Sequence, residues 1–149
     1  MSTPSFTVEA LAAGDYAAWL ELAQGYKTFY ETSLPESAYQ NTWQRIQRGD
    51  GVGAWCARSQ GQLLGITHFL FHASSWSADV CYLQDLFTAS DVRGKGVARA
   101  LIEAVADWAR ERKCPRVYWQ TQDSNATARL LYDKVAVNRG FIRYDIDLA

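Results

Sequence analysis

The sequence is constrained most by segment 82–102, where a run of strand-forming residues passes through two glycines into an amphipathic stretch. Gly94 and Gly96 carry no side chains, so successive backbone N–H groups can face one concavity, at the positive end of the following helix dipole. Such a concavity binds phosphate. Basic side chains in the same turn favour a ligand with more than one phosphate group. These side chains are Arg93, Lys95 and Arg99.

The spacing of the glycines excludes two familiar nucleotide motifs. A dinucleotide-binding fingerprint needs a third glycine at the position of Arg99, and a P-loop needs four residues between its first glycine and a Gly-Lys-Ser/Thr sequence. The remaining pattern is Arg93-x-x-Gly96-x-Ala98. Taken alone, this pattern is also compatible with an ordinary glycine turn that opens a helix.

Composition limits the class of protein. With 149 residues, of which 48% are hydrophobic and 21% charged, the chain is expected to form one globular domain spanning 1–149. A net charge of −1 provides no basic field for nucleic acid, and no run is long enough to cross a membrane. The first residues lack the features of a secretion signal, so we expect a cytoplasmic protein. Three widely spaced cysteines fit neither a disulfide framework nor a zinc pattern.

Periodicity predicts alternating strands and helices along the chain. Strands are expected at 6–10, 52–58, 63–71, 80–88, 116–121 and 141–147. Four helices are expected: one capped by Asp15, one from a Ser33-x-x-Glu36 capping box to 49–51, one from the glycine turn to Cys114-Pro115, and one from Asp123 or Ser124 to 138–140. The strand, helix and strand between 80 and 121 predict a βαβ unit with parallel strands.

Two features allow more than one interpretation. His68 and His72 are four residues apart, which on a strand places them on one face and allows a metal site. Because no third ligand follows at a suitable spacing, histidines on a sheet face are the favoured interpretation, and no metal is predicted. The polar and aromatic segment 27–32 can be a plain connector or part of a substrate wall.

A second motif follows one strand after the glycine turn. Asn125 and Tyr132 are seven residues apart on the predicted helix, so their side chains face the same way. The segment reads Asn-x-x-Ala-x-x-Leu-Tyr and is followed by Gly140-Phe141 and a strand. With the glycine turn, it resembles the GNAT N-acetyltransferase superfamily, most closely its polyamine, amino-acid and histone-type branch. The resemblance covers roughly residues 80–145.

The resemblance implies a fold and a cofactor. The expected fold is α/β, with a mixed sheet of about six to seven strands, about four flanking helices, and a β-bulge at 86–88 that splays the sheet at the acyl-CoA site. Acetyl-CoA would be the acyl donor. The implied contacts to the cofactor are Leu86, Phe87, Thr88, Arg93, Gly94, Lys95, Gly96, Val97, Ala98, Arg99 and Asn125.

The resemblance also implies chemistry at an amine. Tyr132 would donate a proton to the departing thiolate, and a phenol stays protonated at neutral pH. Polyamine-acetylating members have a glutamate, proposed as the base, where this chain has Gln84. Asp85 replaces it only if a bulge turns its side chain toward the acceptor; otherwise it is a buried carboxylate tied to backbone or an arginine, with Asp79 and Glu31 as other candidate acids. The expected substrate-binding residues are Tyr26, Tyr30, Glu31 and Gln84.

The sequence therefore predicts an acetyl-CoA-dependent N-acetyltransferase for a small primary amine, such as a polyamine, diamine or amino acid. Acetylation of a protein lysine is an alternative within the same enzyme class. An acyl-CoA-binding module without turnover is an alternative from another class, which Gln84 favours and Tyr132 disfavours. The resemblance also implies a homodimer that pairs or exchanges its C-terminal strands.

Overall fold

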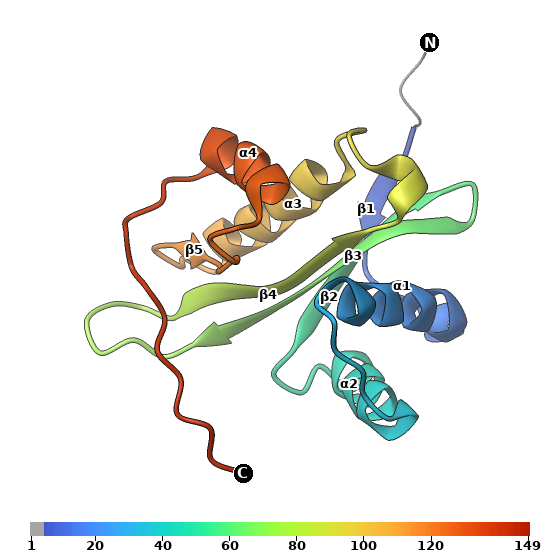
Figure 1. The fold of residues 1–149 in the computed structure, drawn as a ribbon, viewed down its shortest axis with the longest axis horizontal. Helices are drawn as coiled ribbons and strands as arrows, with labels where there is room; N and C mark the ends of the chain where they lie inside the picture. The colour runs from blue at the N-terminus through green and yellow to red at the C-terminus, as the bar shows by residue number, and fades with distance from the viewer. Residues whose placement is uncertain (1–4) are drawn as a thin grey trace. The chain divides into compact units, whose positions relative to one another are not determined.

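The computed structural model describes residues 5–149 and divides them into two compact units, one ending at Trp119 and the other comprising Gln120–Ala149. The first unit holds a five-stranded sheet (Figure 1). Its elements are β1 (Thr7–Glu9), the 3₁₀ turn η1 (Ala13–Asp15), α1 (Tyr16–Phe29), α2 (Glu36–Arg48), β2 (Gly53–Ser59), β3 (Gln62–His72), β4 (Val80–Thr88), the 3₁₀ turn η2 (Ser90–Val92), α3 (Val97–Glu111) and β5 (Val117–Tyr118).

The sheet runs in the order β1-β2-β3-β4-β5. Its first four strands are antiparallel neighbours, whereas β5 is parallel to β4. The predicted mixed α/β fold and the parallel β4–α3–β5 unit are therefore confirmed. The strand count is lower than predicted, because the sheet has five strands in place of six to seven.

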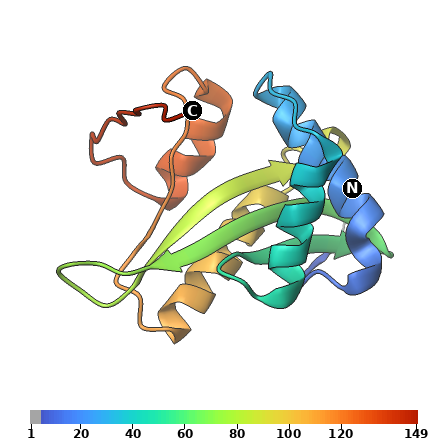
Figure 2. The same ribbon diagram turned by 90° about the horizontal axis from the view of Figure 1, so that it is seen from below.

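Helices cover both faces of this sheet, with α1 and α2 on one face and α3 on the other (Figures 1 and 2). Cys56 belongs to the apolar cluster under α1 and α2, and the next residue, Ala57, belongs to the cluster under α3. Successive side chains of a strand point to opposite faces, so β2 contributes to two separate cores. Trp19 of α1 fills the first core and Leu101 of α3 the second.

Several helix ends differ from the predictions. Asp15 is the N-cap residue of α1 as predicted, but its carboxylate makes no capping bond to the helix: it accepts from the Ala12 N–H and binds Arg58 at 2.6 Å. Ser33 does not cap α2, because the N-cap is the extended residue Pro35, with no side-chain bond. The helix α3 ends before Cys114-Pro115, because Lys113 takes a positive φ of 64° and the Cys114 N–H returns to the Ala109 carbonyl.

The second unit contains one helix, α4 (Ala126–Val135). Its N-cap is Asn125, in place of the predicted Asp123 or Ser124, and the Asn125 side-chain carbonyl oxygen accepts from the Ala128 N–H. The strand predicted at 141–147 is wrong: residues 136–149 form no helix or strand. An extended segment becomes a strand only by hydrogen bonding to a neighbour, and no described strand pairs with this one.

The strand predicted at 116–121 is shorter than expected and comprises only Val117–Tyr118. Within residues 5–149, none of the helices combines the length and the apolar character that a membrane crossing requires.

Candidate active site

The turn between η2 and α3 presents main chain to solvent. Gly94 and Gly96 have φ values of 80° and 84°, a region that favours glycine, and nothing lies within 4 Å of where a Cβ would stand on either. The N-cap Gly96 has no side-chain cap, so the first N–H groups of α3 have no partner within the helix. The turn is therefore an open set of donors at a helix N-terminus, as a phosphate site requires.

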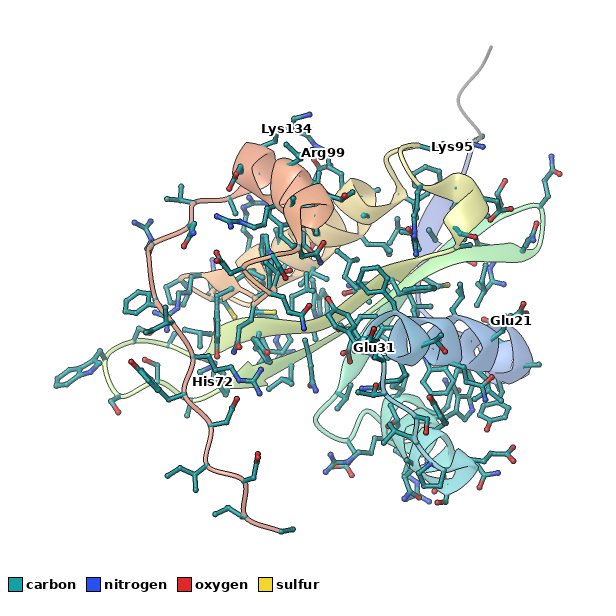
Figure 3. All side chains as sticks on the ribbon, in the orientation of Figure 1. Glu21, Glu31, His72, Lys95, Arg99 and Lys134 are labelled. Atoms are coloured by element: carbon teal, nitrogen blue, oxygen red, sulfur yellow. The ribbon has the colours of Figure 1, made fainter. Side chains whose placement is uncertain are left out.

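The basic side chains of this turn have distinct surroundings. Arg93 lies over the rings of Phe87 and Phe29, with its guanidinium carbon 5.7 and 5.9 Å from their centroids. Arg99 pairs with Glu103 one helical turn further on, at 3.0 Å, and both side chains are exposed. Lys95 is exposed at the turn itself (Figure 3). Exposed pairs of this kind are weak, so Arg99 remains available to an anion.

One edge of β4 is free beside this turn. Its pairing with β5 is limited to Cys81 and Tyr82, so within the described residues no strand pairs with the stretch from Gln84 to Thr88 on that edge. The other edge of β4 pairs with β3 along its length. The backbone groups of Leu86–Thr88 can therefore bind an extended ligand, as a further strand would.

A β-bulge in β4 lies at Gln84, two residues before the predicted stretch 86–88. Asp85 pairs with His68 and Leu83 with Phe69, which leaves Gln84 as the extra residue. On a regular strand Leu83 and Asp85 would share a face. The bulge breaks this alternation, because Leu83 is paired with Phe69, whereas Asp85 faces the α1 side with His68. The bulge therefore places the Asp85 side chain on the α1 face of the sheet, next to His68.

The Asp85 carboxylate ends a buried chain of side chains. The Trp19 Nε1–H donates to His68 Nε2 at 3.0 Å, and His68 Nδ1 lies 2.9 Å from Asp85 Oδ2. Trp19 and His68 are 1% and 6% exposed. The backbone carbonyl of Asp85 accepts from the Thr67 hydroxyl at 2.7 Å. Neighbouring residues of β3 therefore hold both the main chain and the side chain of Asp85.

The surroundings of Asp85 keep its carboxyl ionised. Burial alone would raise its pKa, but the hydrogen bond from His68 opposes this, together with the positive charge of Lys27 and the Tyr26 hydroxyl. The resulting pKa of Asp85 lies below its usual range. The site therefore holds an anion at neutral pH, bound to an imidazole and a phenol in place of the predicted backbone or arginine.

Aromatic rings line the end of α1 beside β4. The centroid of the Tyr26 ring lies 5.0 Å from that of Tyr30 and 6.1 Å from that of Phe87. The Lys27 Nζ atom lies 5.6 Å from the Tyr26 centroid. Segment 27–32 therefore ends α1, and its rings Phe29 and Tyr30 pack against each other and against Tyr26. Glu31 follows these rings, exposed and with a φ of 56° (Figure 3).

The remaining predicted site residues lie in the second unit. Asn125 caps α4 and donates its amide N–H to the Thr121 hydroxyl at 3.3 Å. Tyr132 lies in the second half of α4. The predicted shared helical face assumed that both residues lie inside the helix, whereas Asn125 is its N-cap residue.

The two histidines of β3 form no metal site within the described residues. His68 bonds to Trp19 and Asp85, whereas His72 lies 2.7 Å from the Tyr118 hydroxyl. No group of three metal-liganding side chains occurs in residues 5–149. The sequence does not predict that Trp19 and His68 lie beside Asp85. The available signal was a histidine inside the apolar run 63–71.

Known proteins resemble this chain in sequence and fold. The profile of the acetyltransferase (GNAT) family matches residues 17–136. The D-amino-acid N-acetyltransferase HPA3 of Saccharomyces cerevisiae is 35% identical over 149 residues, covering 97% of this chain and 92% of that protein. A thialysine N-epsilon-acetyltransferase of Caenorhabditis elegans is 32% identical over 103 residues, covering 67% of this chain and 64% of that protein.

Solved structures agree on the fold. AAC(6')-Iy in complex with a bisubstrate analogue has a TM-score of 0.86 at 17% identity, covering 97% of this chain and 99% of that one. A ribosomal-protein-alanine N-acetyltransferase from Brucella melitensis biovar Abortus 2308 has a TM-score of 0.81 at 22% identity, covering 97% and 99%. The profile match and the yeast relative carry the assignment further than the fold does: this chain belongs to the acetyltransferase (GNAT) family and is an N-acetyltransferase.

Proposed function

We propose that the protein transfers an acetyl group from acetyl-CoA to the primary amine of a small molecule, by direct attack in a ternary complex. The observation that carries this proposal is the construction of β4. The strand offers a free backbone edge at Leu86–Thr88 and a partly buried carboxylate at Asp85, and the glycine turn at 93–99 follows it directly. A donor with a diphosphate and an amide-rich arm fits these features together.

The described residues fit acetyl-CoA, which supplies an acetyl thioester when bound. The N–H groups at Gly94, Gly96 and 97–99 would bind the diphosphate, because nothing fills the space over the two glycines. Lys95 and Arg99 would add charge, while Arg93 would do so from its stacked position on Phe87. The main chain of Leu86–Thr88 would hold the pantetheine amides.

The acceptor amine would bind at Asp85. An alkylammonium must lose a proton before it attacks, which at pH 7 costs about 4–5 kcal/mol. A carboxylate whose pKa lies below its usual range does not retain a proton at neutral pH. Asp85 would therefore attract the ammonium. The proton that the ammonium loses would pass by way of the carboxylate to water. Tyr26 and Tyr30 would flank the cation with their rings, and Gln84 and Glu31 would lie at the entrance.

Residues of α4 would complete the chemistry. Tyr132 would donate its phenolic proton to the departing thiolate, since a group with a reference pKa of about 10 can protonate one of about 8.5. Asn125 would contact the cofactor arm while it caps the helix. The family match crosses from the first unit into the second, which supports a single acetyltransferase domain over residues 1–149.

Among small amines, we favour an amino acid over a polyamine. The positive charge of Lys27 lowers the pKa of Asp85, so a cationic and an anionic group influence one another here. An amino acid carries the complementary pair, an ammonium and a carboxylate, whereas a polyamine carries only positive charges. The relative HPA3 is named for D-amino acids and the other for thialysine, also an amino acid, and both names support this choice.

One other substrate class stays open to test. Acetylation of a protein lysine uses the same donor site and the same carboxylate. The acyl-CoA-binding module without turnover, which Gln84 favoured in the sequence, is not supported, because the family match and the yeast relative show an N-acetyltransferase.

A homodimer is the proposed assembly. The side chains at 141–148 are strongly exposed, and from 142 on apolar residues alternate with charged ones as in a strand. Among the described residues, no strand pairs with this segment. The exposed apolar members are Phe141, Ile142, Tyr144, Ile146 and Leu148. A second copy would pair with this segment. Sedimentation velocity should give a dimer for the natural chain and a monomer for Ile142→Asp/Ile146→Asp; a monomeric natural chain would contradict the assembly.

A turnover screen tests the proposed function. Release of CoA from acetyl-CoA is followed with D- and L-amino acids, diamines, polyamines and a lysine peptide. Amino acids should give the highest kcat/KM. A lysine peptide in first place would select the protein-directed alternative, and acetyl-CoA binding without turnover of any of these amines would contradict the proposed small-amine substrates.

A further inference from the structure

The two histidines on one face of β3 differ in the hydrogen-bond partners of their ring nitrogens. His72 Nδ1 faces the Ala73 carbonyl at 2.9 Å, so it carries a hydrogen, and its Nε2 faces the Tyr118 hydroxyl at 2.7 Å. A hydroxyl can donate or accept, so Tyr118 can turn and allow His72 a second proton. His68 has no such freedom.

The Trp19 side chain fixes the tautomer of His68. An indole N–H is only a donor, so the His68 Nε2 that it faces at 3.0 Å must be an acceptor without hydrogen. The single ring hydrogen therefore stands on Nδ1 and points at Asp85, 2.9 Å away. A second proton on Nε2 would meet the indole N–H in a buried site, which is costly.

Two further groups act on Asp85 in the same direction as His68, but both come from another side of the site. The titratable groups that act on Asp85 besides His68 are Lys27 and the Tyr26 hydroxyl, both from α1. Tyr39 of α2 packs edge-on against Trp19, with the ring centroids 6.5 Å apart. Lys27 and Tyr26 lie in the last turn of α1, whereas the donor from His68 comes from the sheet interior.

We propose that Trp19 and His68 are positioning residues for acetyl transfer: Trp19 locks the imidazole as its Nδ1–H form, and this N–H orients Asp85 as a fixed anion for the acceptor ammonium. The role rests on the proposed function, because it assigns the purpose of the carboxylate. It goes beyond that function in stating which side chains make the carboxylate an anion, and it makes the imidazole a hydrogen-bond donor and not a proton carrier.

The direct test reads protonation without turnover. In protein labelled with ¹⁵N-histidine, long-range ¹H–¹⁵N spectra recorded from about pH 8 to pH 5 cover the range in which an ordinary imidazole takes up a proton. His68 should keep a protonated Nδ1 and a bare Nε2 throughout, with His72 as the internal comparison. A hydrogen on Nε2 of His68, or a cationic His68 in this range, would overturn the proposal.

The effect on Asp85 is measured in the same protein. The ¹³C resonance of its carboxyl should titrate at a higher pH in His68→Leu than in the natural protein, because the largest of the contributions that oppose burial is then removed. In His68→Asn, whose amide can donate in place of Nδ1–H, the titration should lie close to the natural one. An unchanged Asp85 titration in His68→Leu would refute the role of the donor even if no amine were acetylated.

Turnover separates positioning from mere packing. His68→Leu should lower kcat/KM for the amine by about 10- to 100-fold, with His68→Asn recovering most of the loss. Trp19→Phe frees Nε2, so it should add an inflection near the ordinary imidazole range to the pH profile of kcat/KM. Melting temperatures identify unfolded variants, and a folded Trp19→Phe with the natural pH profile would contradict the lock.

Discussion

The turn at 93–99 and the cluster around Asp85 are built in opposite ways. The turn presents main chain: Gly94 and Gly96 take left-handed conformations with open space above them. The cluster presents side chains, Trp19 and His68, that are almost wholly buried. The first region depends on backbone shape and the second on the placement of hydrogens. A substitution in the turn should therefore weaken the binding of acetyl-CoA, whereas a substitution in the cluster should impair turnover of the amine.

The largest expected effect is at the turn. Gly96→Glu places a negative charge and a side chain in the space proposed for the diphosphate. Acetyl-CoA at 100 times its dissociation constant should stabilise the natural protein by about 2.7 kcal/mol and raise its melting temperature by about 5–10 °C. Differential scanning fluorimetry should show no such rise for the variant.

Gly61→Glu is the matched control for this change. Gly61 also has a positive φ, 78°, and nothing lies within 4 Å of the position that a Cβ would take there, so both variants carry the same backbone strain. The control protein should keep the full shift with acetyl-CoA. An equal loss in both variants would mean that strain, and not the glycine turn, explains the result.

Tyr132→Phe asks whether the chemistry needs a group outside both regions. Loss of the phenolic proton should lower kcat by about 100-fold or more while the acetyl-CoA shift persists, because the hydroxyl would act on the departing thiolate. Steady-state kinetics with the best amine from the screen measure this. Equal kcat in the two proteins would exclude the proton-donor role.

Asp85→Asn tests the second region alone. The amide keeps nearly the same shape but carries no charge, so kcat/KM for the amine should fall by about 10- to 100-fold with acetyl-CoA binding intact. Asp79→Asn and Glu31→Gln, at the other candidate acids, should change it little. A larger loss in either of these would move the acceptor site away from Asp85.

The smallest expected effect is on stability. Because the pKa of Asp85 is lowered in the folded protein, its stabilising contribution is present above its unfolded pKa of about 4 and is lost as pH falls through the folded value. The free energy of unfolding of the natural protein relative to Asp85→Asn should thus decrease below about pH 4, by on the order of 1 kcal/mol. Urea unfolding at several pH values measures this difference, and a constant difference would contradict the ionised state.

The same contrast explains how much the sequence could predict. The turn follows from local features, two glycines between a strand and an amphipathic stretch, and both β4 at Val80–Thr88 and the start of α3 agree with the predictions. The Asp85 cluster joins residues 17 and more positions apart, Trp19, His68 and Asp85. Its existence depends on the bulge at Gln84, whose position alternation alone does not reveal.

The C-terminal stretch shows a limit of another kind. Its alternation of apolar residues at 142–148 indicates strand propensity, yet the described residues form no strand there. Strand propensity indicates that a segment can form a strand, but a strand also needs the edge of another strand to pair with. The capping box predicted at Ser33 is wrong for a local reason, since Pro35 takes the N-cap position in an extended conformation.

The central claim is that main-chain amides of the glycine turn bind the diphosphate of acetyl-CoA while β4 holds its arm. Backbone ¹H–¹⁵N spectra recorded during titration with acetyl-CoA test this most directly. The largest chemical-shift changes are expected at the backbone amides of Gly94, Gly96, 97–99 and Leu86–Thr88, with the Gly61 amide unchanged. Saturable binding that leaves the amides of the turn unmoved would contradict it.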